Sequence, residues 1–412
     1  MTLGLDCPEK GNGIDMLKHL LYRGYTNGLK AAAYVLPLPK PTLFSGPGSL
    51  HELTEAIVDL GLKKLLLVTD DGLVKVGMAK QVVESAKAKG LDVVLFSEVK
   101  PDPTYDQVES GLAMYFESGC DAILALGGGS AMDCAKVIAA RVTNKKSIKK
   151  LAGLFRVWRT PAPLFVIPTT SGTGSEVTIA AVVSEPDTHH KTPLMDPKLV
   201  PLMAALDSNL LVGLPAKITA DTGIDALTHA VEAYISRNAT METKAYSVAA
   251  IKLVFKYLPR AVEEGSDRQA RHKMAMASYY AGLAFTKASL GYVHAFAHNL
   301  GAKYGLPHGM ANGLALLPVL RFSFSEIEPH LIALSEALIG TQGGHAPSAQ
   351  DFFDRLEGLY NEIGIEQTSS LLQASDTDEL VTLILKEAHW NYPVPKFMNE
   401  EECGQLLAEI RV

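Results

Sequence analysis

At 412 residues, with 47% hydrophobic and 20% charged residues, the chain is long enough for two domains and has a globular enzyme's composition. Its 38 basic and 45 acidic residues give a net charge of −7, which argues against nucleic-acid and anionic-membrane partners. We expect no signal peptide, because no long apolar segment opens the sequence, and no membrane span. The four cysteines form no CxxC pair, so we expect no disulfide framework and a cytoplasmic location.

The first 40 residues are interpreted as an N-terminal extension. Residues 14–25 show weak helical periodicity, and the proline-rich segment at 36–41 would end any helix there. The extension carries no motif that indicates a function.

Beyond it, short apolar runs alternate with segments of helical periodicity. The runs are residues 65–69, 92–96, 121–126 and 164–168, and helical segments include 79–89 and 105–118. Continuous apolar strands alternating with amphipathic helices are typical of a parallel sheet covered on both faces. The sequence therefore predicts an α/β, Rossmann-like nucleotide-binding domain over residues 41–215.

After Pro215 the apolar runs stop and long helical segments follow, over residues 220–236, 244–255, 269–285, 331–338, 350–363 and 377–388. We interpret residues 216–412 as an all-helical, metal-binding domain, with its boundary near Pro215.

Two turns rich in glycine and hydroxyl groups follow two of the predicted strands. The first, Gly-Gly-Gly-Ser at 127–130, precedes a helix over 131–141, and the second, Pro-Thr-Thr-Ser-Gly-Thr-Gly-Ser-Glu, spans 168–176. Each alone is explained equally well by a tight strand–helix turn or a capped helix start. Together, at the carboxyl ends of strands in one sheet, they favour a dinucleotide crevice, although GxGxxG is absent.

Asp70 ends the first strong strand. A carboxylate there can accept hydrogen bonds from an adenosine ribose and would repel a 2′-phosphate, which predicts NAD over NADP. The alternative is an ordinary aspartate in a turn.

The helical half contains a cluster of histidines with one carboxylate. Asp225 and His229 are four residues apart, one turn on one helix face, and His294, His298 and His308 follow within 15 residues of one another. Imidazole and carboxylate together suit Fe, Zn, Co or Ni rather than Ca or Mg. His298 is either a further imidazole ligand or a proton carrier, and isolated core histidines are the competing interpretation.

These segments together resemble the iron-dependent (group III) alcohol dehydrogenases, through residues 69–70, 127–130, 168–176, 223–232 and 294–309. The resemblance implies a dehydroquinate synthase-like architecture with the active site between the two domains. It implies a divalent metal, Fe²⁺ first and Zn²⁺ second, held by Asp225, His229, His294 and His308, with His298 as the catalytic proton carrier. It also implies homo-oligomers, and dinucleotide contacts from Asp70, Gly128, Gly129, Ser130, Thr169, Thr170, Thr173, Lys191 and Phe285.

The expected activity is hydride transfer between NAD(H) and a small primary alcohol or diol, or its aldehyde, with the metal as Lewis acid. A 1,3-propanediol, lactaldehyde or hydroxy-acid dehydrogenase remains open. A dehydroquinate synthase-like lyase would need more basic residues near the metal; glycerol dehydrogenase and a non-enzymatic nucleotide sensor are weaker alternatives. One departure is Asp102, where the family often has Asn; a carboxylate near a pyrophosphate is unfavourable unless it is paired or turned away.

Overall fold

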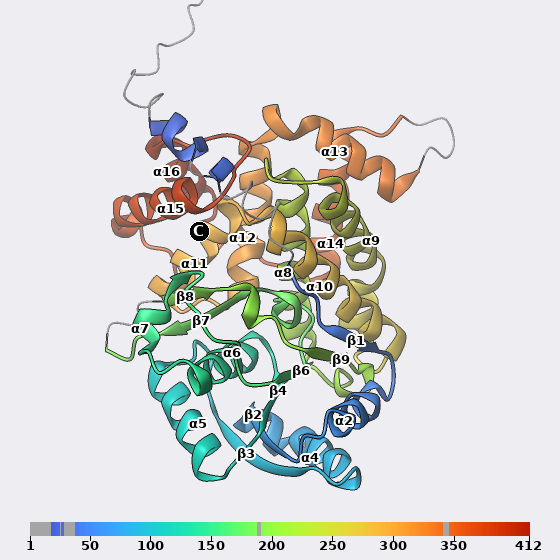
Figure 1. Ribbon diagram of the computed structural model, residues 1–412. Coiled ribbons are helices and arrows are strands. Elements are labelled where there is room, and N and C mark those ends of the chain that lie inside the picture. Colours follow the sequence, from blue (N-terminus) through green and yellow to red (C-terminus); the bar gives the residue numbers. More distant parts are fainter. Residues whose placement is uncertain (1–17, 25, 29–37, 188–190, 341–345) are drawn as a thin grey trace, which may run out of the picture.

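The computed structural model describes residues 18–24, 26–28, 38–187, 191–340 and 346–412. Most of the predicted N-terminal extension therefore lies outside the described residues. In Figure 1 the elements of the first half of the chain form a sheet flanked by helices, and the helices of the second half stack on one side of it.

The first half is built on a six-stranded parallel sheet with strand order β1-β9-β6-β4-β2-β3. Its central strands are short and almost completely buried, as the continuous apolar runs predicted. The strands are β1 (Thr42–Ser45), β2 (Lys64–Asp70), β3 (Asp92–Val99), β4 (Ala122–Gly127), β6 (Leu164–Pro168) and β9 (Met203–Leu206). The predicted parallel α/β sheet is confirmed.

Helices cover both faces of this sheet. Alternate residues of one strand enter separate cores: Leu66 and Val68 pack on one face, whereas Leu65 and Leu67 pack on the other. The covering helices are α2 (Ser49–Asp59), α3 (Asp71–Lys75), α4 (Met78–Ala88), α5 (Tyr105–Glu117), α6 (Gly129–Thr143) and α7 (Ile148–Leu151).

Part of the first half departs from the predicted pattern. A second sheet of order β5-β8-β7 contains an antiparallel pair, so the strands are not all parallel. Its strands are β5 (Gly153–Leu154), β7 (Ala180–Ser184) and β8 (Lys191–Met195). These strands, and β1 and β9, were not predicted, because runs of two to five residues carry little periodic signal.

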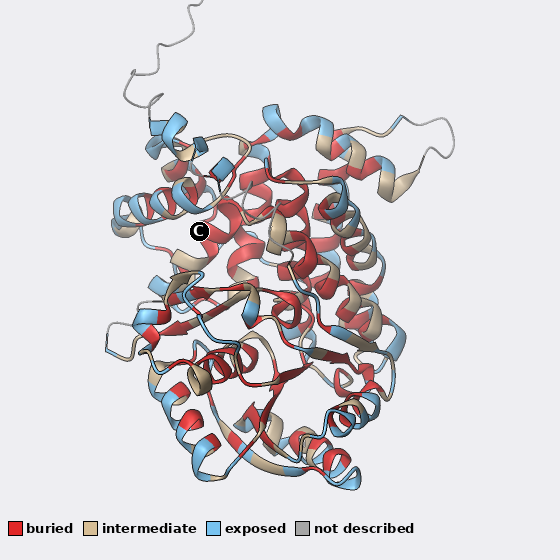
Figure 2. Cartoon of the chain, viewed as in Figure 1, coloured by how far each residue is buried: buried red, intermediate tan, exposed pale blue. Residues whose placement is uncertain are grey.

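The second half is helical, as predicted, and α8 is its central element. Every residue of α8 from 223 to 235 is buried (Figure 2), and the helix packs against α9, α10 and α12. The helices are α8 (Ala216–Ile235), α9 (Met241–Glu263), α10 (Arg268–Ala288), α11 (Tyr292–Tyr304), α12 (His308–Phe322), α13 (Phe324–Ile339), α14 (Ala349–Ile363), α15 (Thr377–Asn391) and α16 (Glu400–Glu409). None of the helices described is long and apolar enough to cross a membrane.

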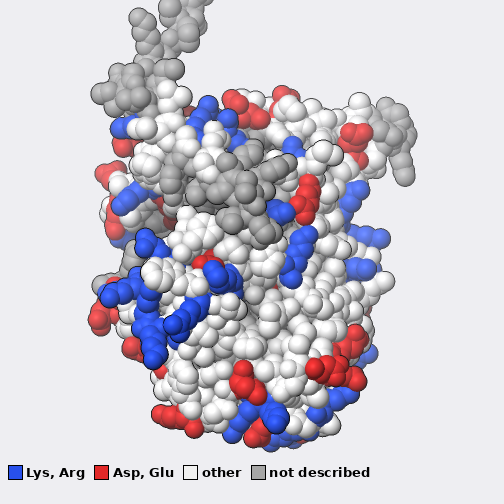
Figure 3. All heavy atoms as spheres, viewed as in Figure 1, with Lys and Arg blue, Asp and Glu red and all other residues white. Residues whose placement is uncertain are grey.

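Charges of both signs are scattered over the face seen in Figure 3, with one local exception. Basic side chains gather around α7, where residues 145–159 include the exposed Lys145, Lys149, Lys150, Arg156 and Arg159. Lys149 is paired with Glu185, so the group is partly neutralised. The basic group is thus confined to the neighbourhood of one short helix.

Candidate metal and dinucleotide site

The predicted metal residues come from three helices that meet beside the sheet (Figure 1). Asp225 and His229 lie one turn apart on α8, His294 is on α11, and His308 begins α12. Ligand atoms of Asp225, His229 and His294 all lie within 4.8 Å of one another. His308 joins this group through its Nε2, which is 3.4 Å from Asp225 Oδ1.

The group fits a metal ion chemically. Asp225, His229 and His294 are each at most 5% exposed, and buried polar groups are unfavourable unless they are paired. Nε2 of His294 makes no hydrogen bond and lies 3.6 Å from Asp225 Oδ1. One carboxylate and three imidazoles form a donor set suited to Fe²⁺ or Zn²⁺.

The protonation states also favour a cation. Burial lowers the pKa of His229 to about 3 and lowers that of His308, so these imidazoles are neutral. Burial raises the pKa of Asp225, but the facing histidines outweigh it and hold this pKa well below its usual value. Burial lowers the pKa of His294, yet Glu232 and Asp225 outweigh it and raise it to about 9. A positive charge is thus favoured between these carboxylates, where a metal can replace the proton.

Two residues that support the group were missed from the sequence. Glu232 accepts a hydrogen bond from Val293 N at 2.7 Å and lies 2.6 Å from His294 Nδ1, which leaves Nε2 for the metal. Asn312 Nδ2 donates to Asp225 Oδ1 at 2.9 Å. The sequence does contain an indication of the role of Glu232, because this residue lies seven positions after Asp225 and shares its helix face.

The two predicted dinucleotide turns face each other. A Cβ added at Gly128 would lie 3.2 Å from Thr170 Oγ1, and one at Gly129 would lie 2.9 Å from Thr173 Cγ2. Gly128 caps α6 without a side-chain hydrogen bond, so the first N–H groups of α6 point to the space that a phosphate would occupy. Thr169 N donates to Gly127 O at 3.0 Å, and Ser130 lies in the first turn of α6.

Side chains of α6 hold the loop of residues 168–176 and the segment that follows it in place. Asp133 accepts a hydrogen bond from Ser175 Oγ at 2.8 Å, and Lys136 Nζ donates to the carbonyl oxygens of Thr178 and Ala180 at 2.9 and 2.8 Å. Burial lowers the pKa of Lys136 to about 8, and the charges of Asp133 and Glu176 oppose this shift. The loop is therefore preorganised by the same helix that starts at the glycine turn.

The same loop reaches the metal group. A Cβ at Gly172 would lie 3.1 Å from Asp225 Oδ2, and Gly172 O lies 3.3 Å from His229 Nδ1. Phe285, at the end of α10, stacks on the His229 ring with centroids 4.2 Å apart. The structure thus brings the predicted dinucleotide loop, Phe285 and the metal residues into one place.

Asp70 lies beside the glycine turn. Its Oδ1 accepts a hydrogen bond from Leu73 N at 3.0 Å, and its Oδ2 would lie 3.8 Å from a Cβ at Gly127. Lys191, by contrast, is engaged with Asp102, Nζ to Oδ1 at 2.9 Å, on the loop after β3. The carboxylate of Asp102 is thus paired, which removes the difficulty raised by its position in the sequence.

His298 lies beside the metal residues, but its hydrogen bond is made to a residue outside that group. Its ring is stacked with that of His308, with centroids 5.3 Å apart, and lies 5.8 Å from that of His294. Its Nδ1 is 2.7 Å from Glu387 Oε1 on α15. His298 is thus adjacent to the group, and one of its nitrogens is already occupied.

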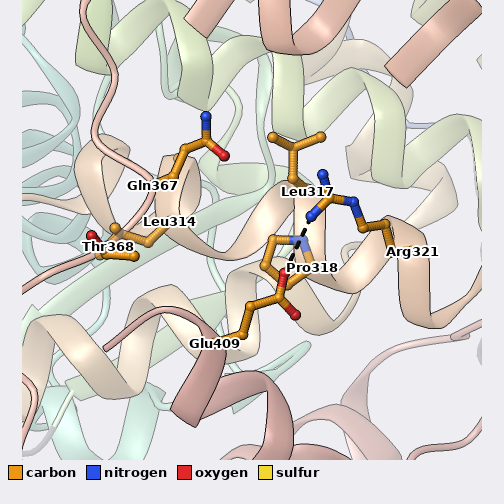
Figure 4. Close-up of a pocket in the computed structure, with 8 residues that line it drawn as sticks. Leu314, Leu317, Pro318, Arg321, Gln367, Thr368 and Glu409 are labelled. Carbon is orange, nitrogen blue, oxygen red and sulfur yellow. Dashed lines mark hydrogen bonds and ion pairs between the residues drawn. The ribbon is translucent and has the colours of Figure 1, made fainter. Parts of the chain in front are cut away.

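A separate hollow on the other end of α12 carries no such chemistry (Figure 4). Its lining includes Leu314, Leu317, Gln367 and Thr368 and none of the predicted site residues. Its one cation, Arg321, already pairs with Glu409 and Glu357 at 3.2 and 2.7 Å. We therefore do not consider this hollow a candidate substrate site.

Comparison with known proteins agrees with this geometry. The family described as iron-containing alcohol dehydrogenase matches residues 40–208, and the C-terminal family of Fe-containing alcohol dehydrogenases matches residues 219–410.

Individual relatives cover most of the chain. Alcohol dehydrogenase 4 of Schizosaccharomyces pombe is 39% identical, over 89% of this chain and 88% of that protein. The 1,3-propanediol dehydrogenase of Klebsiella pneumoniae is 36% identical, over 89% and 96%. The structure of sulfoacetaldehyde reductase from Bifidobacterium kashiwanohense in complex with NAD⁺ superposes with a TM-score of 0.82 and 28% identity, over 91% and 98%. The chain therefore belongs to the iron-containing alcohol dehydrogenase family and is a metal-dependent, NAD-linked alcohol dehydrogenase.

Proposed function

We propose that the enzyme interconverts small primary alcohols or diols and their aldehydes, with Fe²⁺ as the resident metal. The observation that carries this proposal is the contact between the dinucleotide loop and the metal group, in which Gly172 O lies 3.3 Å from His229 Nδ1 and a Cβ added at Gly172 would lie 3.1 Å from Asp225 Oδ2. Hydride transfer requires the nicotinamide and the substrate carbon to be adjacent, and this contact supports such an arrangement. A 1,3-propanediol, lactaldehyde or hydroxy-acid substrate stays within the proposal.

Each site residue then has a defined task. Asp225, His229, His294 and His308 would hold the ion, which when bound supplies a Lewis acid for the substrate oxygen. Glu232 orients His294 through Nδ1. We assign the dinucleotide contacts to Asp70, Gly128, Gly129, Ser130, Thr169, Thr170, Thr173, Lys191 and Phe285. Of these, Phe285 stacks on the His229 ring. His298 would accept the hydroxyl proton of the alcohol, and NAD, when bound, would supply the hydride acceptor.

The remaining assignments are also proposals. The domain division at 215 is supported by the end of β9 at Leu206 and the start of α8 at Ala216. Three buried free cysteines, Cys120, Cys134 and Cys403, support a reducing, cytoplasmic compartment. Strand β1 is at the edge of the sheet, which leaves one side of it for a partner copy and supports a homo-oligomer, either a dimer or a multiple of dimers.

The proposal is tested with purified protein whose metal content has been measured. A panel of short alcohols, diols, hydroxy acids and aldehydes is assayed with NAD⁺ or NADH before chelation, after chelation and after readdition of Fe²⁺ or Zn²⁺. We expect NADH formation from short alcohols that disappears with the metal and returns with it. Turnover that survives complete metal removal, or no turnover of any alcohol by iron-loaded protein, would contradict the proposal.

Replacing Asp70 with serine is expected to raise the use of NADP relative to NAD by about tenfold, equal to about 1.4 kcal/mol. Serine can keep the hydrogen bond to Leu73 N that caps α3, so the fold should be unaffected. The carboxylate that would repel a 2′-phosphate is removed. The measurement is kcat/KM for both cofactors.

The matched control is Asp71→Ser, which removes the neighbouring charge that pairs with Lys75 at 2.9 Å. It should leave the cofactor ratio unchanged. If Asp70→Ser also leaves this ratio unchanged, Asp70 does not read the ribose.

A further inference from the structure

A carboxylate on the last turn of α15 holds His298 from the side away from the metal residues. Glu387 Oε1 lies 2.7 Å from His298 Nδ1, and residues 298 and 387 are brought together by packing of α11 on α15. The side chains of His298 and Glu387 are 32% and 23% exposed, so both are partly shielded from water. An ionised carboxylate is an acceptor only, and His298 Nδ1 must therefore be the donor.

Two further groups fix the carboxylate itself. Tyr392 OH donates to Glu387 Oε1 at 2.7 Å, and Asn299 Nδ2 donates to Oε2 at 3.0 Å. The same Asn299 amide donates to Ala295 O at 2.8 Å, which ties it to α11. Burial raises the pKa of Glu387, but these donors and His298 outweigh it and lower the pKa, so the carboxylate is ionised. Both of its oxygens are thus engaged.

We propose that Glu387 is a positioning residue for proton transfer, which, together with Asn299 and Tyr392, holds the His298 imidazole so that Nε2 faces the reacting substrate. This inference rests on the proposed role of His298. When the alcohol is oxidised, the C–H bond breaks and its electron pair goes with the hydride to the nicotinamide. The O–H bond also breaks, and its proton goes to Nε2. Nδ1–H stays bonded to Glu387 throughout, and Nε2 later releases its proton to solvent.

Glu387 and Glu232 make equivalent contacts to different kinds of histidine. Glu232 bonds Nδ1 of His294, a proposed metal ligand, whereas Glu387 bonds Nδ1 of His298, which is outside the tight metal group. Loss of Glu232 should therefore release metal, and loss of Glu387 should leave the metal in place. Metal content distinguishes the two roles.

The test compares iron-loaded wild type with Glu387→Gln, His298→Ala and the double variant. We expect Glu387→Gln to retain full metal content and lower kcat about 10- to 100-fold, with a much smaller change in KM. The solvent deuterium isotope effect on kcat should rise, because proton transfer becomes slower. In the His298→Ala background the same substitution should have no further effect, since Glu387 acts only through that imidazole.

Tyr392→Phe is a second variant that keeps the ring and removes one donor to Glu387; we expect a several-fold fall in kcat with unchanged metal content. Glu379→Gln is the matched control, because it removes an exposed carboxylate on α15 whose partner is Lys303 at 2.6 Å, and it should behave as wild type.

The inference would be overturned if Glu387→Gln had the wild-type kcat, which would indicate that Glu387 has no role in the reaction. It would also be overturned if the substitution lowered kcat equally in the presence and absence of His298, which would indicate a structural role. An inactive wild type would instead count against the proposed function.

Discussion

Replacing His294 with alanine is expected to abolish both metal retention and alcohol oxidation. The His294 ring lies between Glu232, which contacts Nδ1, and Asp225, which faces Nε2, and this Nε2 makes no hydrogen bond. Without this imidazole, two buried carboxylates are left facing a cavity, and the remaining donors are too few to hold the ion tightly. We expect metal affinity and kcat/KM each to fall more than about 100-fold.

The measurement is metal content by elemental analysis together with NADH formation. His330→Ala is the control, because His330 lies on α13 against Tyr234 and outside the metal group. That variant should keep its metal and its turnover. Full activity in metal-free His294→Ala protein would show that the group of Asp225 and the histidines is not the reaction centre.

Replacing Gly309 with alanine is expected to destabilise the fold and loosen the metal group together. Gly309 follows His308 in the first turn of α12, and an added Cβ would lie 2.1 Å from the carbonyl oxygen of Asp221 on α8. The two helices must separate to admit a methyl group. We expect a loss of about 1–3 kcal/mol or more in unfolding free energy.

Separation of α12 from α8 would also strain the contacts of His308 and Asn312 with Asp225, so metal affinity should fall with stability. Gly358→Ala is the matched control, since Gly358 lies within α14 and an added Cβ would meet nothing within 4 Å. That substitution should stabilise the protein by up to about 1 kcal/mol, because alanine is the better helix former. The same chemical change is thus predicted to have effects of opposite sign at the two positions. A Gly309→Ala protein as stable as wild type would refute the close helix contact.

Local sequence patterns predicted most strands of the six-stranded sheet and most helices of the second half. Strands such as 65–69 and 164–168 are continuous apolar runs, because burial on both faces leaves no polar position. The strands β1 and β9 were missed, since each has four residues and contains no pattern that separates it from a loop. Strand β1 pairs with β9, which is more than 150 positions away in sequence.

The residues of the metal group likewise divide into those that local sequence patterns identify and those that they do not. Asp225 and His229 are readable from the sequence because a helix places residues four apart on one face. Glu232 extends that face, but a buried glutamate on an apolar helix has no local pattern that assigns it to a histidine 62 positions later. Glu387, on α15, was not identified either, because a partly buried carboxylate on a helix has no local pattern that assigns it to a histidine 89 positions earlier.

The amino-acid sequence alone determined most of the helices, the four most apolar strands of the main sheet, the two phosphate-type turns and the residue types able to bind a divalent metal. These follow from periodicity, glycine content and donor chemistry, which act within a few residues. Only the tertiary structure decided that Gly172 contacts Asp225, that Asp102 is neutralised by Lys191, and that Glu387 holds His298. Such contacts depend on the packing of whole helices and loops, because the partners are far apart along the chain.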